Sequence, residues 1–80
     1  MNEHVVVLLT DEGDGPVLMK SLRTSSYEDA VVKGVELARR HLDRKGQLIN
    51  LTEAREYLDT DGLYSVDASW SVCIGILEDN

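Results

Sequence analysis

Apolar and polar residues alternate with the period of an α-helix between residues 25 and 46. Ser25 followed by Glu28 matches the capping box that begins a helix, and Gly46 suits the left-handed position that ends one. Between them, apolar or small side chains recur every three or four residues. The resulting stripe consists of Tyr27, Ala30, Val31, Gly34, Val35, Ala38, His41 and Leu42. The pattern predicts one long amphipathic helix that buries this stripe.

Gly34 lies in the middle of the stripe, where a glycine lowers helix stability by about 1 kcal/mol relative to alanine. Its place on the buried side favours a close approach between the helix and a sheet. A glycine that the helix merely tolerates is the alternative interpretation.

Residues 4–10 and 17–24 have the composition of β-strands. The first segment, HVVVLLT, is short and rich in leucine and in β-branched residues. It is followed by DEGDGP, in which glycine, aspartate and proline are typical of a turn. The sequence therefore predicts two strands joined as a hairpin.

The first of these strands is apolar on both faces. Val5, Val7 and Leu9 point to one side of a strand, and Val6 and Leu8 point to the other. A single helix covers only one face of a sheet, so the second apolar face requires another element of the chain or another molecule.

Residues 47–61 allow two interpretations. Asn50 followed by Glu53 fits a helix N-cap, and a helix over residues 51–59 would place three apolar side chains on one side, Leu51, Ala54 and Leu58. A strand over residues 48–58 would instead place Glu53 and Arg55 on its buried face. Because burying these charges is costly, we favour the short helix.

Residues 64–77 alternate strictly, as expected of one long strand. The side expected to face the helix consists of Tyr64, Val66, Ala68, Trp70, Val72, Ile74 and Ile76. The other side is small and polar and consists of Ser65, Asp67, Ser69, Ser71, Cys73 and Gly75. Trp70 is expected to be the largest core side chain, with its indole N–H hydrogen-bonded.

These elements predict a single α+β domain over residues 1–80. It contains a small antiparallel sheet with the long helix packed on one face, in the order ββααβ. If residues 48–58 form a strand, the order becomes ββαββ and the fold class is unchanged.

The charge of the chain is strongly negative and unevenly distributed. The 80 residues carry a formal net charge of −7, and residues 33–46, with two acids and five bases, are the only positive region. Such a chain is repelled by nucleic acid and by anionic membranes, so we expect neither as a partner. The basic cluster, defined as Arg39, Arg40, Arg44 and Lys45, is explained more simply by the helix dipole and by solubility.

Candidate catalytic and metal-binding residues do not form a recognisable set. His4, His41 and Cys73 lie in no catalytic motif, so we expect no enzyme and no catalytic residue. The acids of the first turn, Asp11, Glu12 and Asp14, lie in a loop too short for an EF-hand, so no metal ligand is assigned. Phosphate-binding glycine motifs are absent from the sequence, and no cofactor is expected. One cysteine excludes an intramolecular disulfide and suits a reducing cytoplasm.

The first functional hypothesis is a protein-interaction module that associates with itself, most simply as a homodimer. It rests on the doubly apolar first strand and on the small side chains of the last strand. The expected self-interface comprises Val5, Val7, Leu9, Ser69, Ser71 and Cys73.

The alternative hypothesis is an acidic inhibitor or nucleic-acid mimic that binds a basic site on a host protein. Small acidic α+β domains recur among phage- and mobile-element-encoded proteins that act by binding a host protein, an analogy of size and charge alone. The expected acidic surface comprises Asp11, Glu12, Asp14, Glu53, Glu56, Asp59 and Asp61.

Overall fold

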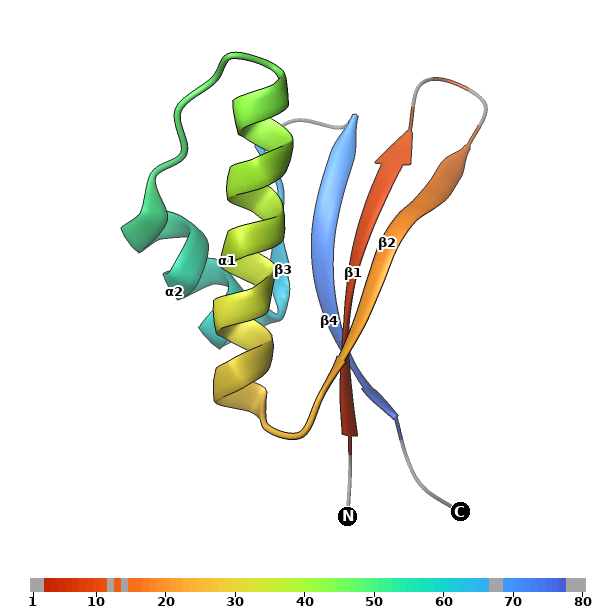
Figure 1. Ribbon diagram of the computed structural model, residues 1–80, viewed down its shortest axis with the longest axis vertical. Helices are drawn as coiled ribbons and strands as arrows, with labels where there is room; N and C mark the ends of the chain where they lie inside the picture. The colour runs from red at the N-terminus through yellow and green to blue at the C-terminus, as the bar shows by residue number, and fades with distance from the viewer. Residues whose placement is uncertain (1–2, 12, 14, 67–68, 78–80) are drawn as a thin grey trace.

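The chain folds as an antiparallel sheet with two helices side by side on one of its faces (Figure 1). The structure is a computed structural model and describes residues 3–11, 13, 15–66 and 69–77. Its elements are β1 (Glu3–Asp11), β2 (Pro16–Thr24), α1 (Tyr27–Arg44), α2 (Leu51–Asp61), β3 (Leu63–Tyr64) and β4 (Trp70–Leu77). The α+β class and the order of the hairpin and two helices are therefore as predicted.

The strands lie in the order β2-β1-β4-β3, so β1 occupies the interior of the sheet. Val7 of β1 pairs with Ser21 of β2 and with Cys73 of β4. The pairing with β2 is interrupted by a bulge, because Leu8 is opposite Lys20 whereas Leu9 is opposite Leu18. The two apolar faces of β1 therefore lie at the middle of the sheet, flanked by β2 and β4.

The long helix begins one residue later than the sequence suggested. The Ser26 hydroxyl, rather than that of Ser25, accepts the hydrogen bond of the cap, from the Asp29 N–H at 3.1 Å. Thr24 still belongs to β2, and its hydroxyl donates to the Ser26 carbonyl oxygen at 3.1 Å. Ser25 therefore lies in the connection between β2 and α1, and Ser26 caps the helix.

The C-terminal end of α1 is a Schellman motif with Gly46 in the left-handed conformation, at φ +70°. The Gly46 N–H donates to the Asp43 carbonyl oxygen at 3.1 Å, and the Gln47 N–H donates to that of Leu42 at 2.9 Å. This confirms the predicted role of Gly46 as the residue that ends the helix.

Gly34 marks a close approach, as its position in the stripe suggested, but its nearest neighbour is α2. A Cβ atom at Gly34 would lie 2.9 Å from Leu58 Cδ1 and 3.5 Å from Val72 Cγ1 of β4. Since Leu58 is fully buried, it has little room to move away. The missing side chain therefore lets α2 and the sheet pack against the same point of α1.

Residues 51–61 form the favoured helix and not a strand. Asn50 Oδ1 accepts a hydrogen bond from the Glu53 N–H at 3.0 Å, and Gly62 ends the helix at φ +68°. The Tyr27 hydroxyl donates to the Leu58 carbonyl oxygen at 2.6 Å, which joins the two helices. Because α2 packs beside α1 and over β3, both helices cover the same face of the sheet.

The prediction of one strand over residues 64–77 was wrong. Two antiparallel strands occupy this region, with Tyr64 of β3 opposite Val72 of β4. A single strand of this length would extend about 46 Å, at about 3.3 Å per residue, whereas the longest dimension of the described structure is 39 Å. Val66 follows β3 and is 59% exposed, whereas Ile76, which shares the parity of the buried Val72, lies near the end of β4 and is 61% exposed. The predicted positions Asp67 and Ala68 lie outside the described residues.

The core lies between the sheet and the two helices. Its buried apolar residues are Val6, Leu8, Ala30, Val31, Leu37, Ala38, Leu42, Ala54, Leu58, Tyr64, Trp70 and Val72. Leu37, which the predicted stripe omitted, is among them. Trp70 is buried between His41 and Tyr64, with ring centroids 5.0 and 5.9 Å away. Contrary to expectation, its indole N–H has no hydrogen-bond partner among the described residues.

Candidate interaction surfaces

The face of the sheet opposite the helices is apolar at its centre, and we call it the open face. Val5, Val7 and Leu9 of β1 point to it, since they alternate with the buried Val6 and Leu8. Their neighbours on β4 are Gly75, Cys73 and Ser71, respectively. Val5, Val7 and Leu9 are half-buried by the surrounding strands, and no described helix or strand covers them. The structure thus brings together five of the six predicted interface residues.

Ser69 lies apart from this group. It precedes β4, and its hydroxyl accepts a hydrogen bond from Lys45 Nζ, at the end of α1, at 3.3 Å. Its carbonyl oxygen accepts a hydrogen bond from the Asp11 N–H at 2.7 Å. These contacts hold Ser69 near the ends of α1 and β1, away from the centre of the open face.

Two leucines extend the open face and were not recognised in the sequence. Leu18 is opposite Leu9 and is 57% exposed, and Leu63 is opposite Cys73 and is 47% exposed. The bulge in β2 resets the alternation of that strand, so the sequence pattern did not assign Leu18 to a face. Leu63 directly precedes the strand predicted over residues 64–77 and was not assigned to a face. Together the two residues widen the apolar surface from β1 and β4 to both outer strands.

Charged side chains lie only at the two ends of the described open face. Arg23 is opposite Val5, and its Nη1 lies 3.9 Å from Glu3 Oε2 in an exposed ion pair. Asp11 lies at the other end, where its Oδ1 accepts a hydrogen bond from the Gly13 N–H at 3.0 Å. The centre between these ends is uncharged.

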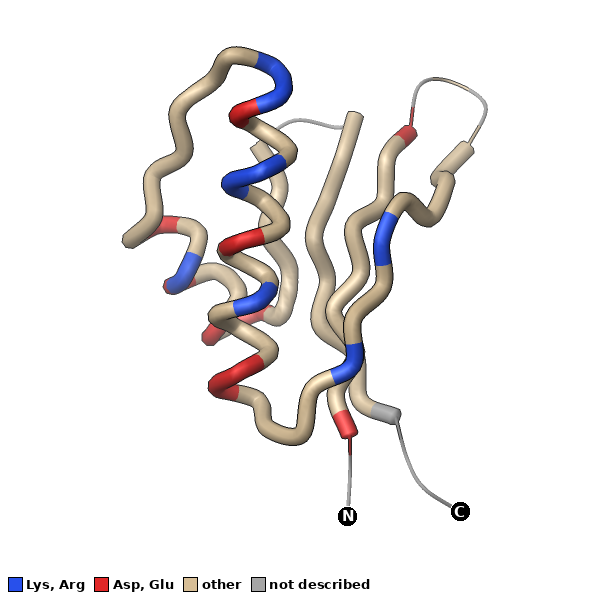
Figure 2. The backbone as a smooth tube through the Cα atoms, viewed as in Figure 1, with Lys and Arg blue, Asp and Glu red and all other residues tan. Residues whose placement is uncertain are grey.

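The predicted acidic surface is divided between two places. Four of its members lie on α2, Glu53, Glu56, Asp59 and Asp61, and all four are exposed (Figure 2). Asp11 lies at the end of β1, whereas α2 packs on α1 and β3. Glu12 and Asp14 lie outside the described residues. The structure therefore groups the α2 acids and separates Asp11 from them.

The α2 acids influence neighbouring tyrosines. Burial raises the pKa of Tyr27 above its usual value, and the nearby carboxylates of Asp59 and Asp61 raise it further. Burial likewise raises the pKa of Tyr64, with Glu53 adding to the effect. Glu53, Glu56 and Asp61 also line one shallow hollow on the outer side of α2. This part of the surface therefore has a local negative potential.

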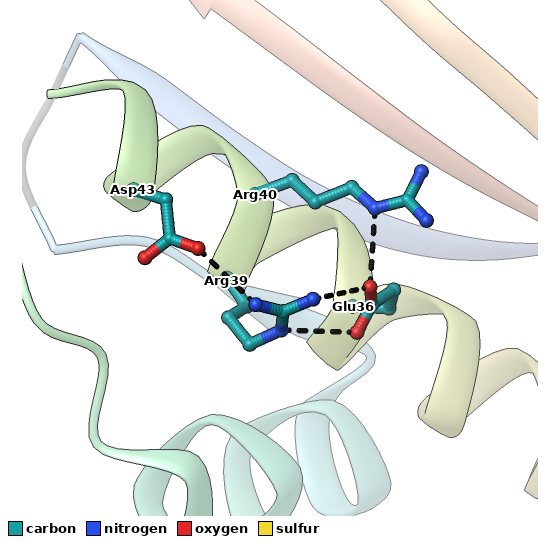
Figure 3. A network of polar contacts seen from close by, with 4 residues as sticks. All are labelled: Glu36, Arg39, Arg40 and Asp43. Atoms are coloured by element: carbon teal, nitrogen blue, oxygen red, sulfur yellow. Dashed lines mark hydrogen bonds and ion pairs between the residues drawn. The ribbon is translucent and has the colours of Figure 1, made fainter.

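The basic cluster is partly neutralised within α1. Arg39 bridges Glu36, through an Nη2–Oε1 distance of 2.6 Å, and Asp43, through an Nη1–Oδ2 distance of 3.1 Å (Figure 3). Arg40 Nε donates to Glu36 Oε1 at 3.1 Å. Hydrogen bonds from Arg39 and then Arg40 lower the pKa of Glu36 below its usual range. The Arg39 guanidinium is therefore paired with two carboxylates of its own helix.

The thiol and the two imidazoles lie on opposite sides of the sheet. Cys73 belongs to the open face and is half-buried, with its Sγ 3.9 Å from Ser71 Oγ. His4 and His41 lie on the helix side, where their rings contact Tyr27 and Trp70. The sheet therefore separates Cys73 from both histidines, and the pair needed for thiol catalysis is not formed.

Neither a metal-binding cluster nor a helix able to span a membrane occurs among the described residues. These residues contain no group of three histidine, cysteine or carboxylate side chains arranged to hold a metal ion. Neither described helix is long and apolar enough to cross a membrane. No protein-family model, curated protein or solved structure matches this chain. The geometry of its surfaces is therefore the basis for proposing a function.

Proposed function

We propose that this chain is a protein-interaction module of the cytoplasm that associates with itself through the open face. The observation that carries the proposal is that both helices cover the same face of the sheet. This leaves Val5, Val7 and Leu9, flanked by Leu18 and Leu63, without a covering layer. A second copy would remove this apolar surface from water and form a sandwich of two sheets about 10 Å apart. The single cysteine favours a reducing compartment.

A second copy suits this face because the face is uncharged at its centre. Two chains of net charge −7 repel each other over most of their surfaces. The open face is where they can approach with the fewest charges in contact. The small side chains of Ser71 and Cys73 and the absence of one at Gly75 permit close packing of the partner sheet.

The charges at the ends of the open face favour one orientation of the two copies. Arg23 lies level with Val5, six residues before Asp11 along β1, or about 20 Å away. With the β1 strands of the two copies parallel, a two-fold axis would bring each Asp11 near the other. With the strands antiparallel, it brings Arg23 of each copy near the partner's Asp11. We therefore propose the antiparallel arrangement.

The proposal is tested by placing a charge at the centre of the open face. Val7→Lys should convert the dimer to a monomer, because the ammonium group would be buried in the sandwich without a partner. Val32→Lys, on the exposed side of α1, is the matched control and should leave the dimer intact. A soluble Val7→Lys variant that is still dimeric would refute the role of this face.

The orientation has a separate test, a charge exchange. Arg23→Asp should weaken the dimer on the order of tenfold, since symmetry repeats each contact. Adding Asp11→Arg should restore most of the affinity. A dimer whose affinity does not respond to either change would contradict the antiparallel arrangement and leave self-association standing.

A second candidate function, an acidic inhibitor or nucleic-acid mimic, is favoured by the grouping of acids on α2. Glu53, Glu56 and Asp61 line one hollow and could occupy a basic groove on a target protein. Such a complex should weaken steeply as salt concentration rises, because its attraction is electrostatic. Binding to a basic partner that is indifferent to salt, or unchanged by Glu56→Gln with Asp61→Asn, would exclude this function.

A further inference from the structure

A small hollow lies on the helix side of the sheet, between β2 and the second half of α1. Its volume is about 160 Å³. Lys20 of β2 lines one side, and Arg40, His41 and Arg44 of α1 line the other. Leu8 and Leu37 contribute apolar surface to it. Two elements far apart in the sequence thus bring four basic side chains to one place.

The bulge in β2 contributes to the construction of this hollow. Consecutive residues of a regular strand point to opposite faces, yet Met19 and Lys20 both line the hollow. This is possible because the bulge leaves Met19 without a partner on β1, between Leu18 and Lys20. Bulges commonly redirect side chains next to functional sites. Here the bulge adds an apolar side chain beside the lysine.

No carboxylate lines the hollow among the described residues. Glu36 engages only Nε of Arg40, and the two terminal nitrogens of that guanidinium extend beyond it (Figure 3). The dipole of α1 accounts for basic residues near its C-terminal end, such as Arg44. It does not account for Lys20, which comes from a strand. In a chain with 15 acids and 8 Lys or Arg residues, this local excess of positive charge is unusual.

We propose that this hollow binds a phosphate group, held by Lys20, Arg40 and Arg44. Lysine supplies a compact charge and arginine a planar pair of donors, a combination suited to the oxygens of a phosphate. Met19 is the exposed apolar residue of the lining, so a substituent on the phosphate would lie against Met19. A ligand bearing a small apolar substituent on its phosphate fits best. The hollow is on the opposite side of the sheet from the open face, so binding is independent of self-association.

The test is a titration of the full chain followed by ¹H–¹⁵N NMR, with inorganic phosphate, with phenyl phosphate and with chloride at matched ionic strength. Both phosphates should cause saturable shifts at the amides of Lys20, Arg40 and Arg44. Phenyl phosphate should bind more tightly because its ring covers the apolar surface. Lys20→Gln and Arg44→Gln should each weaken binding about fivefold or more. Lys33→Gln, an exposed cation elsewhere on α1, is the control and should leave binding unchanged.

Three results would overturn the assignment. Chloride could reproduce the shifts, which would indicate screening of surface charge. Lys20→Gln could bind phosphate with the same affinity as the unmodified chain, or Lys33→Gln could weaken binding by the same factor as Lys20→Gln. Either result would place the anion elsewhere. Equal affinity for the two phosphates would overturn the preference for an apolar substituent and leave the phosphate group as the only feature recognised.

Discussion

The hydroxyl of Tyr27 donates a 2.6 Å hydrogen bond to the main-chain carbonyl oxygen of Leu58. The bond joins the first turn of α1 to the last turns of α2, and a second contact of the same hydroxyl reaches the Asp59 carbonyl oxygen at 3.1 Å. It fixes α2 beside α1 on one face of the sheet. Because the two helices pack together on one face, the opposite face is left uncovered. The proposed self-association rests on that uncovered face.

Removing this hydroxyl should loosen the helix pair. We expect Tyr27→Phe to lower the free energy of unfolding by about 1 kcal/mol, the usual net contribution of one hydrogen bond. Urea unfolding monitored by circular dichroism measures the change. Tyr57→Phe, at an exposed position of α2, is the matched control and should change stability little. Equal effects of the two substitutions would show that the Tyr27 bond does not hold α2 in place.

The same tyrosine predicts how stability depends on alkaline pH. Because burial and neighbouring acids raise the pKa of Tyr27, the folded state keeps the phenolic proton at pH values where the unfolded state has lost it. The resulting stabilisation is complete below the unfolded value of about 10 and is lost as pH rises through the folded pKa. The stability difference between the unmodified chain and Tyr27→Phe should therefore shrink above pH 10. A difference that stays constant to pH 11.5 would contradict this explanation.

The position of the α1 cap gives a comparison between adjacent serines. Ser26→Ala should lower the free energy of unfolding by about 1 kcal/mol, because the Asp29 N–H loses its acceptor. Ser25→Ala should be close to neutral, since no described hydrogen bond involves the Ser25 side chain. Chemical unfolding of the two variants distinguishes the two possible starts of the helix. A larger loss for Ser25→Ala would return the cap to the position suggested by the capping-box pattern.

Gly34→Ala tests the contact between the helices. The methyl group gains about 1 kcal/mol of helix propensity but meets Leu58 Cδ1 at 2.9 Å, and such overpacking costs about 1–3 kcal/mol. We expect a net loss of about 1 kcal/mol. In a Leu58→Ala background the clash is removed, so the same substitution should become stabilising. A Gly34→Ala effect that is the same in both backgrounds would contradict the close approach.

Features that depend on local periodicity were predictable from the sequence. The stripe of α1, its glycine end and the N-cap of α2 all follow from side chains within one or two turns of each other. The choice between Ser25 and Ser26 as the N-cap of α1 was not predictable, because either hydroxyl can cap a helix. It is decided by Thr24, which remains in the sheet and lengthens the connection.

Features that depend on chain reversal or pairing were not predictable from alternation alone. Tyr64 and Trp70 point to the same face of the sheet in the hairpin, as they would in one long strand. The alternation therefore did not reveal the turn between them. The bulge at Met19 likewise arises from pairing with β1. It places Leu18 opposite Leu9 and Lys20 opposite Leu8, so these two side chains point to opposite faces of the sheet. The apolar character of both faces of β1 was visible in the sequence. The packing of both helices on the same face depends on the close contact at Gly34 and on the hydrogen bond of Tyr27. Both contacts join segments far apart in the sequence.

The central claim is that the open face is a self-interface, and the absolute mass of the untagged chain in solution tests it most directly. Light scattering after gel filtration should be measured at low and high salt. The proposal predicts twice the chain mass at both, because burial of apolar surface is not screened by salt. A monomer at every soluble concentration would contradict self-association through Val5, Val7 and Leu9, and the acids of α2 would become the leading site for a partner.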